Sequence, residues 1–214
     1  MKCLFVGFGT IAQKHYNALN YLIPDCQFFA LRSGTVAKFE KPNIINIYSW
    51  EDLPDHIDFA IISTPTHLHV DSLNKLVDLG VSLFIEKPVA DKLDGLNELI
   101  QKINYKKIKT YVACNLRFLP VLNYFINIIL PTISKINEVT IYCGSHLPSW
   151  RPNEDFKTFY SAHEEKGGGV HLDLFHELDY ACWLFGMPNR THRVLTNNSN
   201  LNITAKDFAN FRVT

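Results

Sequence analysis

The chain lacks an excess of charge of either sign and lacks a long apolar run. Lys plus Arg number 21, as do Asp plus Glu, among 214 residues, so there is no overall field to attract nucleic acid or an anionic membrane. No apolar run approaches the ~18 residues that a membrane-spanning helix requires. Both absences argue against nucleic-acid and membrane partners, and they favour a small molecule.

Cysteine is scarce and lacks the spacing of a metal or redox motif. The five cysteines are odd in number and widely scattered, and none forms a Cys-x-x-Cys pair. This usage is typical of reduced structural thiols, so we expect a cytoplasmic protein without a catalytic cysteine. The opening stretch MKCLFVGFGTIAQKH also fits a short signal peptide, because one lysine precedes an apolar run. Its two glycines favour a strand and a turn instead.

Six short apolar runs predict buried parallel strands. They cover residues 2–6, 27–31, 44–48, 58–62, 82–85 and 109–113. Helical spacing is found between them, less regularly in residues 11–22 and 67–79 and most clearly at Leu93, Leu96, Leu99, Ile100 and Ile103. This alternation predicts an α/β fold in which right-handed crossovers build a doubly wound Rossmann sheet.

The alternation stops after about residue 118, where we expect a second domain to begin. We therefore assign residues 1–118 to a Rossmann domain and residues 119–214 to a second domain. The elements expected in the second domain are a helix over 119–130, a strand over 138–144, a polar loop over 145–166, a helix over 170–185, and strands over 193–197 and 208–213. Three glycines precede the long helix, and Gly186 and Pro188 follow it, as is common just beyond a helix end.

The fingerprint of a dinucleotide-binding turn follows the first strand. Gly7-Phe-Gly9-Thr10-Ile11-Ala12 lies between an apolar run and a helical segment, which is the context that G-x-G-x-x-G/A requires. One glycine allows the tight turn, the next lets the backbone approach a diphosphate, and the small Ala12 lets the helix pack closely. Because amide donors and the dipole at a helix start favour an anion, we expect this segment to bind NAD or NADP. The alternative is an ordinary glycine turn.

No acidic residue follows the second strand. NAD-binding domains usually place Asp or Glu there to bind the ribose hydroxyls, but this chain has Leu31-Arg32-Ser33. A guanidinium and a hydroxyl suit a 2′-phosphate, so Arg32 and Ser33 favour NADP over NAD. Alternatively, Arg32 stacks on the adenine or faces solvent.

Three further motifs occur in order along the chain. They are Ser63-Thr64-Pro65-Thr-His-Leu-His69, Glu86-Lys87-Pro88, and Gly167-Gly-Gly-Val-His-Leu-Asp173-Leu-Phe-His176. Together with the glycine turn, they resemble the glucose-fructose oxidoreductase and inositol dehydrogenase family, called Gfo/Idh/MocA, from Met1 to about residue 190. The Glu-Lys-Pro tripeptide is weak alone, whereas the four motifs in this order are specific.

The resemblance implies roles for individual residues. It implies cofactor contacts from Ser63, Thr64, Pro65, His69, Glu86 and Lys87. It implies substrate contacts from Asp173 and His176, and from Arg117 in the segment that joins the two domains. The second domain would be a partial α+β domain with an open, mainly antiparallel sheet.

The stretches 147–152, 160–162 and 176–180 resemble members of the family that serve bacterial surface-sugar biosynthesis. This narrower resemblance implies a sugar or a nucleotide-activated sugar as the substrate. Trp150, Arg151 and Tyr160 lie in a loop placed to contact that substrate; the alternative is that they are packing and solvated residues.

Hydride transfer to or from a secondary alcohol also needs a group that exchanges the hydroxyl proton. Lys87 is the leading candidate, because a partly desolvated lysine beside the nicotinamide ring can exchange a proton near neutrality; the alternative is that it only binds ribose or phosphate. Asp173 and His176 either hold sugar hydroxyls, complete a proton relay, or form a buried hydrogen-bonded pair.

His171 and His176 are five residues apart and do not share a helical face as H-E-x-x-H ligands do, so we expect no metal.

Two departures from the family pattern bear on activity. Only two residues separate Asp173 from His176, where relatives commonly have three, although a spacing of three still keeps both side chains on one helical face. The chain ends at Thr214, within an early strand of the expected sheet, which suggests a fragment or a shortened protein. The resemblance implies a homo-oligomer only for a full-length relative.

Three functions are therefore open: an NAD(P)-dependent sugar oxidoreductase, a dinucleotide-binding protein without turnover, and a redox-neutral relative of the glycosidase type.

Overall fold

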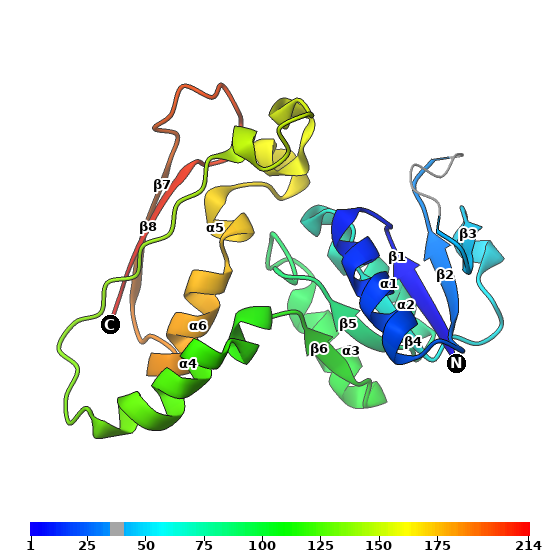
Figure 1. The fold of residues 1–214 in the computed structure, drawn as a ribbon, viewed down its shortest axis with the longest axis horizontal. Helices are drawn as coiled ribbons and strands as arrows, with labels where there is room; N and C mark the ends of the chain where they lie inside the picture. Colours follow the sequence, from blue (N-terminus) through cyan, green and yellow to red (C-terminus); the bar gives the residue numbers. More distant parts are fainter. Residues whose placement is uncertain (35–40) are drawn as a thin grey trace. The chain divides into compact units, whose positions relative to one another are not determined.

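The computed structural model describes residues 1–34 and 41–214. The chain divides into two compact units, Met1–Ala113 and Cys114–Thr214, whose elements are labelled in Figure 1. The boundary expected after residue 118 lies at the end of a 3-10 helix, Asn115–Phe118, inside the second unit.

The first unit is built on a six-stranded parallel sheet. Its strands are β1 (Lys2–Val6), β2 (Gln27–Leu31), β3 (Ile44–Ile47), β4 (Phe59–Ile62), β5 (Ser82–Ile85) and β6 (Thr110–Val112), in the order β3-β2-β1-β4-β5-β6. Every neighbouring pair is parallel, and Val6 at the end of β1 pairs with Leu31 on one side and Ile62 on the other. The predicted α/β fold with a doubly wound sheet is confirmed.

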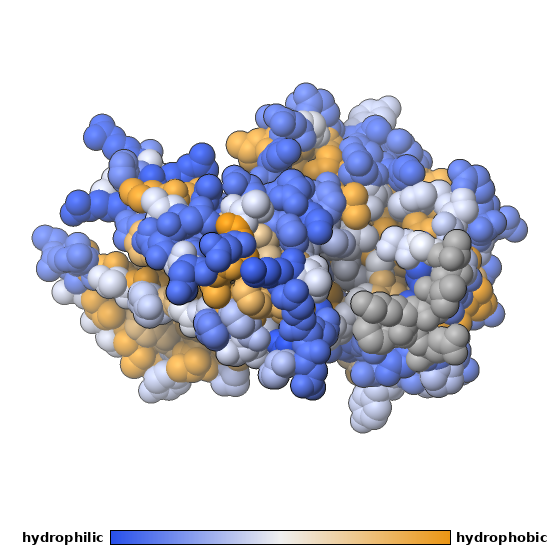
Figure 2. All heavy atoms as spheres, turned by 90° about the horizontal axis from the view of Figure 1, so that it is seen from above, coloured by the Kyte–Doolittle hydropathy of each residue, from blue (hydrophilic) through white to orange (hydrophobic). Residues whose placement is uncertain are grey.

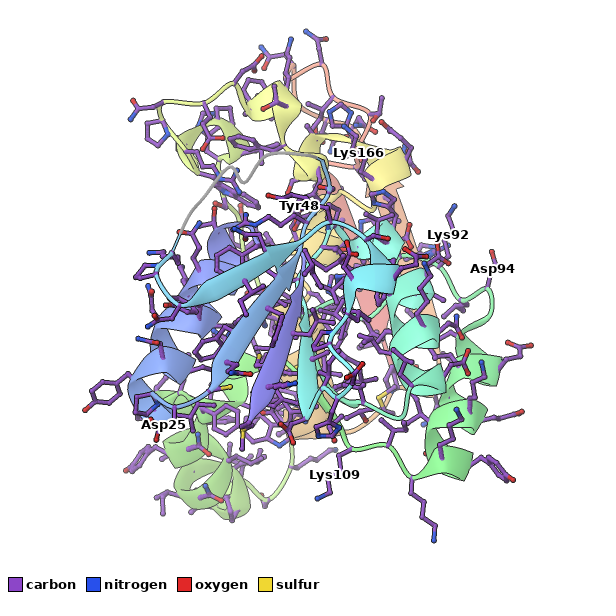
Figure 3. All side chains as sticks on the ribbon, turned by 90° about the vertical axis from the view of Figure 1, so that its right-hand side faces the viewer. Asp25, Tyr48, Lys92, Asp94, Lys109 and Lys166 are labelled. Carbon is purple, nitrogen blue, oxygen red and sulfur yellow. The ribbon has the colours of Figure 1, made fainter. Side chains whose placement is uncertain are left out.

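Helices cover both faces of this sheet, with α1 (Thr10–Leu22) on one side and α2 (His69–Asp78) and α3 (Leu96–Lys106) on the other (Figure 3). Because side chains alternate along a strand, β1 supplies both cores. Cys3 and Phe5 pack in the cluster that includes residues of α1, whereas Leu4 and Val6 pack in the cluster that includes residues of α2 and α3.

The predicted face of α3 was partly wrong, both at its start and at Ile100, which is 46% exposed. Leu93 is 83% exposed and precedes the helix, which begins only after Gly95 takes a left-handed conformation with φ 70°. Leu99, by contrast, is fully buried as predicted. Two 3-10 turns, Trp50–Asp52 and Thr66–Leu68, complete the first unit.

The loops that follow the strands lie together at the carboxyl ends of the strands. Figure 3 shows Tyr48 and Lys92, which follow β3 and β5, at one edge, and Asp25 and Lys109, which precede β2 and β6, at the opposite one. The strand order reverses between β1 and β4. Such a switch point, at the carboxyl ends of the strands, is where open α/β sheets bind ligands.

The second unit contains short helices and one antiparallel strand pair. Its helices are α4 (Pro120–Tyr124), a π-helical turn (Phe125–Ile129), α5 (Val170–Asp173) and α6 (His176–Phe185). Its strands are β7 (Thr191–Thr196) and β8 (Phe208–Val213), which pair with each other. Single 3-10 turns occupy Leu130–Thr132, Leu147–Ser149, Phe156–Thr158, Tyr160–Ala162 and Glu164–Lys166.

Two predictions for the second unit were wrong. Residues 138–144 form no strand: they pair with no described strand, and Val139 and Tyr142 are exposed. A strand needs a partner for its backbone hydrogen bonds, and a local apolar pattern does not supply one. The helix expected over 170–185 is interrupted at Leu174, whose φ of −95° and ψ of 34° end α5.

The buried core of the second unit is small. Leu147, Phe159 and Ala162 form it, with Leu201 and Ile203 packed against them. Large apolar side chains remain at the surface, among them Val121, Tyr142 and Met187, and Figure 2 shows apolar patches within an otherwise hydrophilic surface.

Candidate functional site

The turn after β1 has two glycines with different structural roles. Gly7 has φ +81°, its N–H donates to the Leu31 carbonyl at 2.9 Å, and a Cβ built on it would lie 2.9 Å from Thr64 Cγ2. Gly9 has φ −87°, and a Cβ built on it would meet no atom of residues 1–34 and 41–214 within 4 Å. The fold therefore requires a glycine at position 7, whereas a side chain at position 9 would only enter open space beside the turn.

The amino end of α1 directly follows the glycine turn. Gly9 is its N-cap residue and provides no side-chain cap, and Thr10 and Ile11 are exposed. The first N–H groups of a helix have no partner within the helix, and the helix dipole adds positive potential there. Ala12 is fully buried against the sheet, so a small side chain lets this helix end approach the strands.

The loop after β4 lies directly beside the glycine turn. The Ser63 N–H donates to the Val6 carbonyl at 3.0 Å, and the Ser63 hydroxyl donates to the Gly7 carbonyl at 3.0 Å. Thr64 Oγ1 is buried and has no hydrogen-bond partner among the described residues. An orphaned hydroxyl, a helix start without a side-chain cap and the space at Gly9 fit a polar, phosphate-bearing ligand such as a dinucleotide.

Arg32, at the end of β2, is held firmly in place. Its side chain is 8% exposed, its Nε donates to Asn46 Oδ1 at 2.6 Å, and its guanidinium lies 4.8 Å from the centre of the Phe8 ring. The alternative that Arg32 faces solvent is therefore wrong. Ser33, the next residue, is exposed. The partner Asn46 lies on β3 and carries no sequence signal that links it to Arg32.

His69 is buried beneath two loops of the site. The side chain is 1% exposed; Nδ1 lies 3.0 Å from the Pro88 carbonyl oxygen and Nε2 lies 2.9 Å from the Thr64 carbonyl oxygen. Burial lowers the pKa of His69, although the two carbonyls oppose this shift. The imidazole thus connects the loop after β4 with the segment after β5, and it acts on the site through these loops.

Glu86 and Lys87 follow β5 at the same edge. Glu86 Oε1 lies 2.6 Å from His15 Nε2, and both side chains are mostly buried. Lys87 is half-buried, and its peptide bond to Pro88 is cis. His15 was not predicted as a site residue; its position on α1, one turn after Ala12, was the available signal, because residues three apart share a helical face.

In the second unit, Asp173 and His176 belong to different helices, α5 and α6. The two side chains therefore do not share one helical face as the spacing of three predicted, because Leu174 leaves the helical conformation. Asp173 Oδ1 accepts hydrogen bonds from the Tyr160 hydroxyl at 3.0 Å and the Ser161 hydroxyl at 3.1 Å. These bonds fix the carboxylate against the 3-10 turn that contains both hydroxyls.

The other predicted substrate residues already have partners within the second unit. Arg117 donates from Nε and Nη2 to the two oxygens of Asp179, at 3.0 and 2.6 Å, and this carboxylate is almost fully buried. Arg151 lies 3.5 Å from Glu154 and over the Phe159 ring. Trp150 donates from Nε1 to Ser145 Oγ at 2.6 Å. Asp179 was not predicted as a partner of Arg117, because tertiary structure sets this pairing.

A pocket of about 270 Å³ lies in the second unit. It brings Trp150 and Asp173 together with residues of the β7–β8 connection that the sequence analysis missed. Its lining consists of Ser145, His146, Leu147, Trp150, Ser161, Val170, Asp173, Leu174, Ser199, Asn200, Leu201, Ile203, Lys206 and Asp207. We call it the second-unit pocket.

Among residues 1–34 and 41–214, no three His, Cys, Asp or Glu side chains gather so as to hold a metal ion. None of the helices formed there combines the length and the apolar character needed to cross a membrane.

Two family models match consecutive parts of the chain. The oxidoreductase family model described as an NAD-binding Rossmann fold matches residues 1–113. The model of the C-terminal alpha/beta domain of the same oxidoreductase family matches residues 133–210.

Individual relatives match at low identity. Inositol 2-dehydrogenase of Rhizobium meliloti is 28% identical over 85% of the chain and 54% of its own length. 2,7-Anhydro-N-acetylneuraminate hydratase of Mediterraneibacter gnavus is 27% identical over 66% of the chain and 36% of its own length. The chain thus spans about half or less of these curated relatives.

The fold is shared with a solved structure, the WlbA dehydrogenase of Chromobacterium violaceum in complex with NADH and UDP-GlcNAcA. The match has a TM-score of 0.73 at 18% identity, and it covers 100% of the chain and 63% of the dehydrogenase. At this identity the match concerns the architecture only.

Proposed function

The chain belongs to the Gfo/Idh/MocA oxidoreductase family, and from this membership we propose that it transfers a hydride between NAD(P) and a sugar or nucleotide-activated sugar. The names of two relatives support a polyol or sugar-type substrate: one is an inositol dehydrogenase, and the WlbA dehydrogenase structure contains UDP-GlcNAcA. A role in surface polysaccharide synthesis is part of this proposal.

The geometry of the glycine turn supports the cofactor part of the proposal. The amides from Gly9 to Ala12 would hold the diphosphate, since no side chain caps the start of α1 and these amides carry the positive end of its dipole. Arg32 and Ser33 would hold a 2′-phosphate, so we favour NADP over NAD. The fixed guanidinium of Arg32 supports this choice because a rigid fork of donors suits a phosphate.

The hydride transfer and the binding of the substrate would depend on residues outside the glycine turn. When bound, the nicotinamide supplies or accepts the hydride. Lys87 would exchange the proton of the substrate hydroxyl, with His69 and the Glu86–His15 pair holding the segment that carries it. Asp173 and His176 would position the substrate, and the hydroxyl groups bonded to Asp173 keep its carboxylate in one orientation.

The single observation that carries the proposal is the open space beside Gly9. We therefore expect Gly9→Ala to keep the melting temperature of the wild type but to weaken NADH and NADPH binding about tenfold or more, as loss of charge-assisted hydrogen bonds to phosphate would. Binding is measured by the change in cofactor fluorescence on titration.

Gly7→Ala is the matched comparison. Its left-handed backbone costs about 1 to 2 kcal/mol for a residue with a side chain, and its Cβ would clash with Thr64, so this variant should lose stability. If Gly9→Ala bound the cofactor as well as wild type, or if the wild type did not bind it at all, the proposal would be abandoned.

One observation favours a redox-neutral reaction as a second candidate. A relative over 66% of the chain is named a hydratase and not a dehydrogenase. In such a reaction the bound cofactor is unchanged after a full cycle. Net formation of NAD(P)H in proportion to product would exclude it, whereas product formation without net reduction would support it.

A further inference from the structure

We propose that His69 is a positioning residue that holds either the Thr64 carbonyl or the Pro88 carbonyl, and that a bound dinucleotide decides which. The imidazole lies between the loop after β4 and the segment after β5. Its Nε2 is 2.9 Å from the Thr64 carbonyl oxygen, and its Nδ1 is 3.0 Å from the Pro88 carbonyl oxygen. The inference rests on the proposed function, because it makes the position of Lys87 depend on the bound cofactor.

The ring has one proton for these two acceptors. A neutral imidazole donates from one nitrogen and accepts at the other, whereas a carbonyl oxygen can only accept. His69 is almost fully buried, and burial lowers its pKa, so the neutral ring is favoured. Three backbone hydrogen bonds and one nearby carboxylate oppose this lowering of the pKa; they belong to Thr64, Pro88, Val89 and Glu86. The carbonyl that does not receive the proton faces a nitrogen lone pair.

Two arrangements with the same charge follow. With the proton on Nε2, His69 donates to the Thr64 carbonyl, and with the proton on Nδ1 it donates to the Pro88 carbonyl. The proton that leaves one nitrogen is taken up at the other, so the ring stays neutral in both. Because a buried acceptor without a donor is unfavourable, a small displacement of either carbonyl is enough to select the other arrangement.

Thr64 is the residue that a dinucleotide would displace. It lies tightly against the glycine turn, since a Cβ built on Gly7 would be 2.9 Å from Thr64 Cγ2 and 3.1 Å from its backbone nitrogen. Thr64 Oγ1 is buried and has no hydrogen-bond partner among the described residues. A phosphate or ribose oxygen that bonds this hydroxyl must therefore draw the residue outward. The carbonyl of the same residue then moves away from His69 Nε2.

The other carbonyl lies one residue beyond Lys87. On the opposite side of Lys87, Glu86 Oε1 is 2.6 Å from His15 Nε2. When Nδ1 donates to the Pro88 carbonyl, the segment is therefore held on both sides of Lys87. We assign the Nε2 proton to the chain without ligand and the Nδ1 proton to the chain with a bound dinucleotide, so that cofactor binding fixes the segment that carries Lys87.

The test locates the proton by NMR. In the full chain labelled with nitrogen-15 histidine, long-range nitrogen–proton correlation distinguishes a protonated ring nitrogen from an unprotonated one, and the spectrum of His69→Gln identifies the signals of His69. We expect the proton on Nε2 without ligand and on Nδ1 at saturating NADPH. The exposed His56, which pairs with Asp58, is the internal control and should not change. The same nitrogen protonated in both states, or both nitrogens protonated, would overturn the inference.

Two amide variants imitate one arrangement each. The side-chain amide of Asn places its donor near the position of Nδ1, and that of Gln places it near the position of Nε2. Because binding and arrangement are coupled reciprocally, His69→Gln should bind NADPH about fivefold or more weakly than His69→Asn. A histidine with a structural role only would give equal dissociation constants in the two variants. Where a variant does not fold, the NMR result on the wild type decides.

The same titration separates this inference from the proposed function. Binding of NADPH without a change in the protonated nitrogen would overturn only the role of His69. No binding of NADPH at millimolar concentration would overturn the proposed function, and it would overturn this inference too because His69 would have no ligand to respond to.

Discussion

His15 Nε2 lies 2.6 Å from Glu86 Oε1, which joins helix α1 to the segment that carries Lys87. Both side chains are mostly buried, so the pair is less screened than a surface ion pair. A double-mutant cycle with His15→Ala and Glu86→Ala should give a coupling free energy of unfolding of about 1 kcal/mol. The exposed His56–Asp58 pair is the control and should give a smaller coupling. Equal coupling in the two cycles would contradict a structural role for the buried pair.

Arg32→Ala should change cofactor preference. We expect the affinity for NADPH to fall about tenfold relative to that for NADH, because only NADPH has the 2′-phosphate to lose a charged partner. The ratio of the two dissociation constants is the measurement, since Arg32 also bonds Asn46 and its removal affects the fold. Asn46→Ala, which keeps the guanidinium, should change the ratio less. An unaltered ratio in Arg32→Ala would leave Arg32 with a structural role only.

Lys87→Ala should separate turnover from binding. We expect turnover to be lost while the dissociation constant of the dinucleotide stays within about tenfold, because a proton-exchanging group is removed and the phosphate site is intact. Turnover is followed as NAD(P)H formation with a panel of sugars. Lys87→Arg is the matched control; it keeps the positive charge but holds its proton at neutral pH, so it should also be inactive. A parallel loss of binding and turnover would reassign Lys87 to the binding of ribose or phosphate.

His69 should make folding stability depend on pH. Because burial lowers the pKa of His69 below its ordinary 6.5, the unfolded chain takes up a proton on acidification before the folded chain does. Stability should therefore fall as pH drops below 6.5, by up to ~1.4 kcal/mol per pH unit from this residue. Urea unfolding from about pH 7 to about pH 5 measures this slope. His69→Gln should show a shallower slope, and an identical slope would mean that other groups cause the dependence.

The parallel sheet was predictable because its signals are local. Strands such as β1 and β4 are buried on both faces, so they read as continuous apolar runs, and turns such as Gly7-Phe-Gly9 separate them from the following helices. Once strands and helices alternate, the handedness of the crossovers leaves few arrangements. The same reasoning placed the glycine turn at the end of an interior strand.

The second unit was less predictable because its structure depends on distant partners. Residues 138–144 have the composition of a strand but no partner among the described strands, and the break at Leu174 has no proline or glycine to signal it. The pocket residues Ser199 and Asn200 lie in a connection without a motif. Their proximity to Trp150 arises only from tertiary packing, which no periodicity in the sequence encodes.

The contrast between Gly7 and Gly9 has a consequence for natural variation. A change at position 7 damages folding itself, whereas a Cβ at position 9 meets no atom of the part of the chain that the structure describes. Selection for a stable domain therefore acts on the first position, and selection for cofactor use acts on the second. Descendants that had kept this architecture but abandoned the dinucleotide would be identified by drift at position 9 beside an unchanged position 7.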